Sequence, residues 1–250
     1  MTAMEPRRWR IHGPAIGGDG EVWAYGHYGR PVLAFPSQQG AVGDFALHGM
    51  VYALEDLLTA GRIKLYCVES LDGRTWFDDS LPIEERARRH RAYASWLYDH
   101  VAPAIREDCG GRDDTITTGA SFGAYHAVHA TLQRADLFPT AIGLSGVYDL
   151  ERIGAWGEPG DDTYFANPSA YVGNLEGGHL DWLREAAELI LVCGQGQWED
   201  TSGALDSTRA FAGQAVGQGL RVHLDLWGHD MPHDWPSWRR MLAHHLDRIC

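Results

Sequence analysis

The sequence predicts an α/β protein with a mostly parallel central sheet and helices on both faces. Short apolar runs rich in β-branched residues alternate with longer segments of helical periodicity, which is the pattern of parallel strands joined by crossover helices. Glycine accounts for 30 of the 250 residues without any collagen-like period, so it marks turns between packed elements. No apolar run approaches the roughly 20 residues that a membrane-spanning helix needs.

The expected strands are short apolar runs that end at glycine or polar residues, and the expected helices repeat apolar residues every three to four positions. Gly29-Arg30 separates the first two strands, and Gly61 ends the first helix. In chain order the strands are 21–28, 31–35, 63–68, 115–118, 140–144, 189–193 and 220–226, and the helices are 44–59, 83–107, 122–133, 201–216 and 235–249.

One segment, 147–178, interrupts this alternation. It contains six glycines and two prolines and shows no clear period. Loops of this length in a compact domain are usually functional or flexible, and this one would lie beyond a strand end, where open α/β sheets bind ligands. We therefore expect a single domain over residues 1–250, with an irregular insertion at about 147–178 over the functional end of the sheet.

The composition argues against several classes of protein. A net charge of −13 opposes binding to nucleic acid or to an anionic membrane, both of which favour a basic surface. The four cysteines form no Cys-x-x-Cys pair, so we expect free thiols rather than a disulfide or zinc framework. The first residues lack the apolar stretch of a secretory signal, and a cytoplasmic protein is expected. The oligomeric state stays open, a homo-oligomer included.

Gly119-Ala120-Ser121-Phe122-Gly123 matches the Gly-x-Ser-x-Gly pattern of a nucleophile elbow, with an expected strand before it and a helix after it. Glycines on both sides keep Cβ atoms out of the sharp turn, so the serine Oγ projects alone. The first turn of the helix then aims backbone N–H groups at a developing oxyanion. Ser121 is therefore the candidate nucleophile, and the alternative is a turn serine that caps its helix.

A serine nucleophile needs a histidine base, which in this chain order follows the serine and an acid. His233 lies directly before the last helix on a loop bounded by prolines, and His229 lies nearer the end of the last strand. We favour His233 and keep His229 as the alternative. A metal site on the two histidines is not expected, because two prolines and a glycine nearby disfavour a helical His-x-x-x-His face.

The carboxylate that orients the histidine is expected on the loop after strand 189–193. Glu199 and Asp200 both lie there, just before a helix, where the helix dipole alone would favour an acidic residue. Glu199 is the first choice, Asp200 the second, and Asp149, after the preceding strand, the third. On the strand-end loops, Trp76 and Trp198 are candidate substrate contacts, with ordinary core packing as the alternative for each.

These residues resemble the esterase D-like family of the α/β-hydrolases, which also includes mycolyltransferases. The resemblance covers roughly Trp9 to the C-terminus and implies the α/β-hydrolase fold. Its carriers are Phe35-Pro36-Ser37, Tyr66-Cys67-Val68-Glu69-Ser70 with Trp76, the elbow extended to His126, Leu144-Ser145-Gly146-Val147-Tyr148-Asp149, and His233-Asp234-Trp235-Pro236-Ser237-Trp238.

The resemblance supports His233 over His229 and implies an oxyanion hole made by the backbone N–H groups of Phe122 and Gln38. The sequence departs from the family at Gln197, where many relatives have the acid. We therefore interpret the sequence as that of a serine hydrolase that cleaves small-molecule carboxylic esters through an acyl-enzyme and needs no metal or organic cofactor. An acyltransferase with the same triad and a catalytically silent binding or scaffold protein with the same fold stay open.

Overall fold

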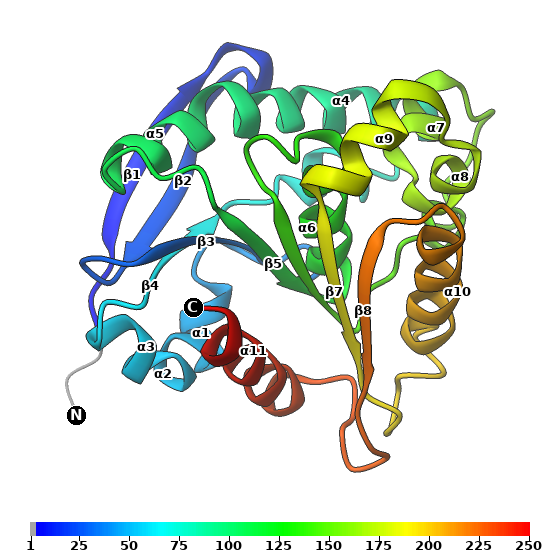
Figure 1. Cartoon of the computed structure of the whole chain (residues 1–250). Coiled ribbons are helices and arrows are strands. Elements are labelled where there is room, and N and C mark those ends of the chain that lie inside the picture. The colour runs from blue at the N-terminus through cyan, green and yellow to red at the C-terminus, as the bar shows by residue number, and fades with distance from the viewer. Residues whose placement is uncertain (1–3) are drawn as a thin grey trace.

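A computed structural model describes residues 4–250 and arranges them around one eight-stranded sheet of order β1-β2-β4-β3-β5-β6-β7-β8 (Figure 1). The β1–β2 and β2–β4 pairs are antiparallel, and every pair from β4–β3 to β7–β8 is parallel. The predicted mostly parallel sheet is thus confirmed. The strands are β1 (Arg7–Gly13), β2 (Gly18–Tyr25), β3 (Arg30–Phe35), β4 (Ile63–Val68), β5 (Ile116–Ala120), β6 (Thr140–Leu144), β7 (Glu188–Cys193) and β8 (Arg221–Leu226).

Helices lie on both faces of the sheet (Figure 1). The α-helices are α1 (Asp44–Leu47), α2 (Met50–Ala53), α3 (Glu55–Thr59), α4 (Ile83–Trp96), α5 (Ala102–Asp108), α6 (Phe122–Gln133), α7 (Asp161–Ala166), α8 (Pro168–Tyr171), α9 (Gly177–Ala186), α10 (Ala204–Gly217) and α11 (Trp235–Ile249). Short 3-10 turns are η1 (Pro14–Ile16), η2 (Asp72–Arg74), η4 (Leu150–Ile153) and η5 (Val172–Asn174), and η3 (Leu97–Val101) is a π-turn.

The strand residues divide between the two faces with a period of two. In β3, Val32 and Ala34 pack in one core cluster with residues of α1–α3 and α11, whereas Leu33 and Phe35 pack in another with residues of α4, α5 and α6. Successive side chains of a strand point to opposite faces. Because both faces are covered by helices, the central strands are buried on both faces, which is why they read as largely apolar runs in the sequence.

Three local differences separate the fold from the sequence prediction. The sequence does not predict β1, since this edge strand is polar and only alternate residues are partly buried. Segment 44–59 forms three short helices, because Gly49 takes a left-handed φ of 72° between the first two. Segment 83–107 is interrupted by the π-turn η3 just before Pro103, whose ring nitrogen cannot donate the hydrogen bond that a continuous helix requires.

The insertion at 147–178 is more ordered than its sequence suggests: it contains η4, α7, α8 and η5 and leads into α9. It is anchored to α4 by Glu84, whose carboxylate accepts hydrogen bonds from the amides of Gly160, Asp162 and Thr163 and from the Thr163 hydroxyl. These amides lie at the start of α7, where a helix leaves its N–H groups unpaired. The expectation of an irregular loop is therefore wrong. The Glu84 carboxylate on α4 caps α7, and the sequence of the insertion does not reveal this distant partner.

A cluster of three buried histidines lies between α4 and α6. The ring of His90 is 5.2 Å from those of His126 and His129, measured between centroids. Burial, together with the two neighbouring histidines, holds the pKa of His90 well below its usual 6.5, and burial, with His126, lowers the pKa of His129 to about 3. The rings of His90 and His129 are therefore neutral in the folded protein at neutral pH.

We expect acid to destabilise the protein through this cluster. Below pH 6.5 the unfolded chain binds protons at His90 and His129 that the folded chain does not, so the free energy of unfolding falls as the pH decreases. Each histidine contributes a slope of about 1.4 kcal/mol per pH unit once the unfolded form is fully protonated. Urea denaturation between about pH 7 and pH 5 measures this slope. His129→Leu should make it shallower, and an unchanged slope would contradict the prediction.

Within residues 4–250, no helix is long and apolar enough to cross a membrane. No group of three or more His, Cys, Asp or Glu side chains within that range is arranged to hold a metal ion. All four thiols are free, with Cys67 and Cys193 buried.

Candidate active site

The elbow joins β5 to α6 by a sharp turn at Ser121, which adopts a φ of 56° and a ψ of −119°. A Cβ on Gly119 would overlap the backbone of Gly123, and a Cβ on Gly123 would overlap the carbonyl of Pro36. The two glycines therefore allow the helix to start directly against the strand and against the loop after β3. The Ser121 side chain does not cap α6, so its hydroxyl is available for other contacts.

The loops after β7 and β8 are held together by backbone hydrogen bonds. The Gly196 amide donates to the Met231 carbonyl at 3.0 Å, and the His233 amide donates to the Gln197 carbonyl at 2.9 Å. A Cβ on Gly194 would overlap the Met231 carbonyl, so glycine is needed for this close approach. The pairing brings Glu199 from one loop beside His233 from the other.

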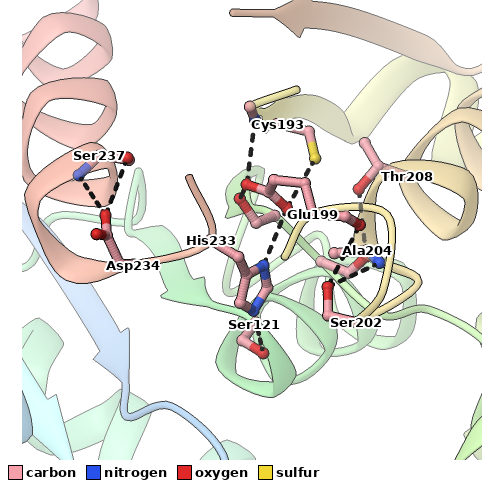
Figure 2. Close-up of polar contacts among 12 residues, drawn as sticks. Ser121, Cys193, Glu199, Ser202, Ala204, Thr208, His233, Asp234 and Ser237 are labelled. Atoms are coloured by element: carbon pink, nitrogen blue, oxygen red, sulfur yellow. Dashed lines mark hydrogen bonds and ion pairs between the residues drawn. The ribbon is translucent and has the colours of Figure 1, made fainter. Parts of the chain in front are cut away.

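Ser121, His233 and Glu199 form a continuous chain of contacts (Figure 2). The Ser121 Oγ lies 3.1 Å from His233 Nε2, and His233 Nδ1 lies 2.9 Å from Glu199 Oε2. The histidine is partly exposed, whereas the Glu199 side chain is 0% exposed. Because a carboxylate only accepts hydrogen bonds, Nδ1 carries the ring proton and Nε2 presents a lone pair to the serine hydroxyl.

Further donors compensate the buried Glu199 carboxylate. The Ser145 hydroxyl donates to Oε1 at 2.5 Å, and the Gly194 amide donates to the same oxygen at 3.3 Å. Trp238 Nε1 in turn donates to Ser145 Oγ at 3.0 Å, and its ring lies edge-on to His233 with centroids 4.9 Å apart. A buried charge needs such partners to offset its lost hydration, so Ser145 and Trp238 fix the carboxylate that contacts the histidine.

The alternative residues lie in other surroundings. Asp200 is exposed, and its side chain accepts a hydrogen bond from the Thr201 amide at 2.8 Å rather than reaching His233. Asp149 caps η4 by accepting from the Glu151 amide. His229 is exposed, and its Nδ1 lies 2.8 Å from the Gln195 carbonyl. None of the three makes a hydrogen bond to Ser121 or His233 within the described chain.

The two candidate substrate contacts differ in exposure. Trp76 is 0% exposed and packs in a core cluster with Phe122 and Tyr125, so its side chain presents no surface to a ligand. That prediction is wrong for Trp76, because a strand-end aromatic here fills the core. Trp198 is 51% exposed, has a φ of 70° and directly precedes Glu199. Its exposed ring therefore remains a candidate contact.

The loop after β3 carries the other candidate oxyanion donor. The Ser37 amide donates to Asp44 Oδ2 at 2.9 Å, and the Gln39 amide donates to Asp72 Oδ2 at 3.1 Å. Across residues 4–250, the Gln38 amide between them has no hydrogen-bond acceptor. The Phe122 amide is the first of α6, where N–H groups have no partner within the helix. Both amides are thus free to donate to an anion.

Ser145, Trp238 and His126 belong to the segments that carry the family resemblance, but the sequence predicts no site role for them or for Asp72. Ser145 and Trp238 surround Glu199, while Asp72 and His126 form a buried contact behind the elbow. Ser145 carries a weak sequence signal, because it directly follows an apolar strand and precedes a glycine. For Trp238, Asp72 and His126, nothing in the local sequence indicates these contacts.

A scan against protein-family profiles and a search of curated protein sequences both find no match. Among solved structures, the chain is similar to a ferulic acid esterase, with a TM-score of 0.72 and 14% identity over 97% of both chains. It is also similar to Mycobacterium tuberculosis MPT51, with a TM-score of 0.75 and 16% identity over 99% of this chain and 98% of that one.

A third similar structure is the S-formylglutathione hydrolase of Agrobacterium tumefaciens, with a TM-score of 0.73 and 12% identity over 99% of this chain and 95% of that one. Similarity over nearly the full length of each protein shows that the chain has the α/β-hydrolase fold. The fold that the sequence resemblance implied is confirmed. Because fold alone does not determine activity, the chemistry has to be argued from the site.

Proposed function

We propose that this protein is a serine esterase that hydrolyses small-molecule carboxylic esters with Ser121 as nucleophile, His233 as general base and Glu199 as the orienting acid. The observation that carries the proposal is the unbroken chain of contacts from Ser121 Oγ through His233 to the buried Glu199. This arrangement of nucleophile, base and orienting carboxylate is the one that activates a serine hydroxyl. The esterases and hydrolases among the similar structures support the same activity.

The reaction proceeds in two steps. His233 Nε2 takes the proton of the Ser121 hydroxyl as Oγ attacks the ester carbonyl, and the resulting imidazolium gives that proton to the departing alcohol. This leaves an acyl-enzyme on Oγ. In the second step His233 takes a proton from a water molecule as that water attacks the acyl carbonyl, and the imidazolium then returns the proton to Ser121 Oγ as the bond from Oγ to the acyl carbon breaks and the acid leaves. Glu199 stays ionised throughout and stabilises the imidazolium through Nδ1.

The oxyanion of each tetrahedral intermediate would be held by the amides of Phe122 and Gln38. Both are free to donate, and the Phe122 amide also lies at the positive end of α6. Preorganised donors of this kind stabilise charge that develops only in the transition state. The exposed ring of Trp198 beside Glu199 is the proposed contact for an apolar part of the substrate.

A fluorophosphonate probe together with a series of p-nitrophenyl esters of increasing chain length tests the proposal. The wild-type protein should be labelled and should turn over at least one ester. His233→Ala should lower both labelling rate and kcat by about 100- to 10,000-fold, because it removes the general base. His229→Ala is the matched control and should retain activity within about threefold, since His229 contacts only a loop carbonyl.

Each other outcome points to a different function. Labelling without turnover would favour an acyltransferase whose alcohol acceptor is missing from the assay. No labelling would favour a catalytically silent binding or scaffold protein. A larger loss in His229→Ala than in His233→Ala would overturn the assignment of the base.

A further inference from the structure

A buried Asp-His pair lies behind the elbow and takes no part in the proposed triad. Asp72 Oδ1 lies 2.9 Å from His126 Nε2, and the two side chains are 0% and 1% exposed. Because a carboxylate accepts only, the ring proton sits on Nε2. Asp72 belongs to η2, and His126 lies in α6. The pair therefore joins the segment after β4 to the helix that begins at the nucleophile.

The second oxygen of Asp72 holds the loop that carries the proposed oxyanion donor. Asp72 Oδ2 accepts the Gln39 amide at 3.1 Å, and Gln39 has a φ of 55°, a conformation that a residue other than glycine adopts only when its surroundings impose it. On the other side, Asp44 accepts both the amide and the hydroxyl of Ser37. Two buried carboxylates thus hold the amides that flank the free amide of Gln38.

The His126 ring also contacts both segments that supply the proposed donors. It lies edge-on to Phe122, with centroids 5.2 Å apart, and stacks on Phe35, with centroids 5.5 Å apart. Phe122 provides one donor amide, and Phe35 ends the strand that leads into the Gln38 loop. A single imidazole therefore packs against one side of the oxyanion hole and, through Asp72, is hydrogen-bonded to the other.

We propose that Asp72 and His126 are positioning residues that hold the Gln38 amide in line with the Phe122 amide and so set the strength of oxyanion stabilisation. The inference rests on the proposed function. Neither side chain is exposed enough to touch a substrate, so their effect must act through the loop. An oxyanion donor is effective only when it is held in place before the charge develops.

The first test measures the loop without any assay of activity. Amide hydrogen exchange at Gln39, followed by NMR, should accelerate by about tenfold or more in His126→Leu, because a freed Asp72 no longer fixes its acceptor oxygen. His126→Gln should stay closer to wild type, since its amide nitrogen can take the place of Nε2. His129→Leu is the control: His129 is also buried in α6, but its ring stacks on Tyr125.

The second test measures the oxyanion hole itself by comparing an ester with its thionoester, in which sulfur replaces the carbonyl oxygen. Wild-type protein should prefer the oxygen ester, because amide donors bind oxygen more strongly than sulfur. His126→Leu should lower kcat for the ester by about 100-fold with KM nearly unchanged, and should reduce the ester-to-thionoester preference. His126→Gln should recover much of both, whereas a purely structural role would leave the preference unchanged.

Asp72→Asn provides a second variant if His126→Leu does not fold. It preserves the volume of Asp72, but its one carbonyl oxygen can accept from only one of the two donors that the carboxylate serves. The same readouts apply to it. Unchanged Gln39 exchange in these variants, or an equal loss of oxygen preference in His129→Leu, would overturn the inference. Failure of the proposed function would instead appear in the wild-type protein, as absence of labelling and turnover, while the exchange measurement would still decide whether the pair holds the loop.

Discussion

Ser121→Ala should lower ester turnover by at least about 10,000-fold, because it removes the only oxygen that can form the acyl-enzyme. The melting temperature should hardly change. The Ser121 hydroxyl contacts His233 but does not cap α6, and alanine keeps the Cβ that the turn already accommodates. Steady-state kinetics with a p-nitrophenyl ester and thermal unfolding measure the two effects. More than about 1% of wild-type kcat in this variant would remove Ser121 from the mechanism.

Ser121→Gly is the informative companion to this variant. It should be equally inactive but more stable than Ser121→Ala, since glycine adopts the φ of 56° at Ser121 without steric strain. Strain of this kind is worth about 1–3 kcal/mol at a residue with a side chain. A gain in stability together with lost activity would show that the elbow holds its serine in an unfavourable conformation for the sake of the hydroxyl.

The central part of the fold could be predicted because burial imposes a clear pattern there. Strands β3 to β7 are buried on both faces, and α6 follows the elbow directly. The edge could not be predicted in the same way. Strand β1 pairs with β2 over its whole length, yet it is polar, and nothing local distinguishes it from a loop. The helices within the insertion at 147–178 could not be predicted for a similar reason, since the carboxylate that caps α7 is that of Glu84 on α4, far away in the sequence.

In the candidate site, too, the sequence predicts the residues that lie in local motifs and misses those that are brought together only by the fold. Ser121 lies in a local motif, so the sequence identifies it directly, and the loop that carries His233 precedes a predicted helix. The residues that support the site lie far apart in sequence and meet only in three dimensions, as Ser145 does with Glu199 and Asp72 with His126. The sequence favours Glu199 over Asp200 but does not decide between them, because the side chain that faces His233 depends on the backbone turn at Trp198, where φ is 70°.

The choice between Glu199 and Asp200 leads to the second prediction of a large loss of activity. Glu199→Gln should lower kcat by about 10,000-fold with little loss of folding. Its amide N–H₂ group would donate to His233 Nδ1, which moves the ring proton to Nε2 and leaves no lone pair to accept the serine proton. The carbonyl oxygen of glutamine can still accept from Ser145 or the Gly194 amide. The free energy of unfolding should therefore fall by no more than about 1–3 kcal/mol.

Asp200→Asn is a closely matched control, because it makes the same carboxyl-to-amide change at the neighbouring residue. Asp200 is exposed, and its one hydrogen bond is to the next amide in the turn, which an asparagine oxygen can also accept. It should keep full activity and change stability by less than about 0.5 kcal/mol. Measuring kcat and the urea midpoint for both variants separates the roles. An inactive Asp200→Asn beside an active Glu199→Gln would reverse the assignment, and two active variants would transfer the orienting role to Asp149, whose present contacts are with the Glu151 amide and Asn167.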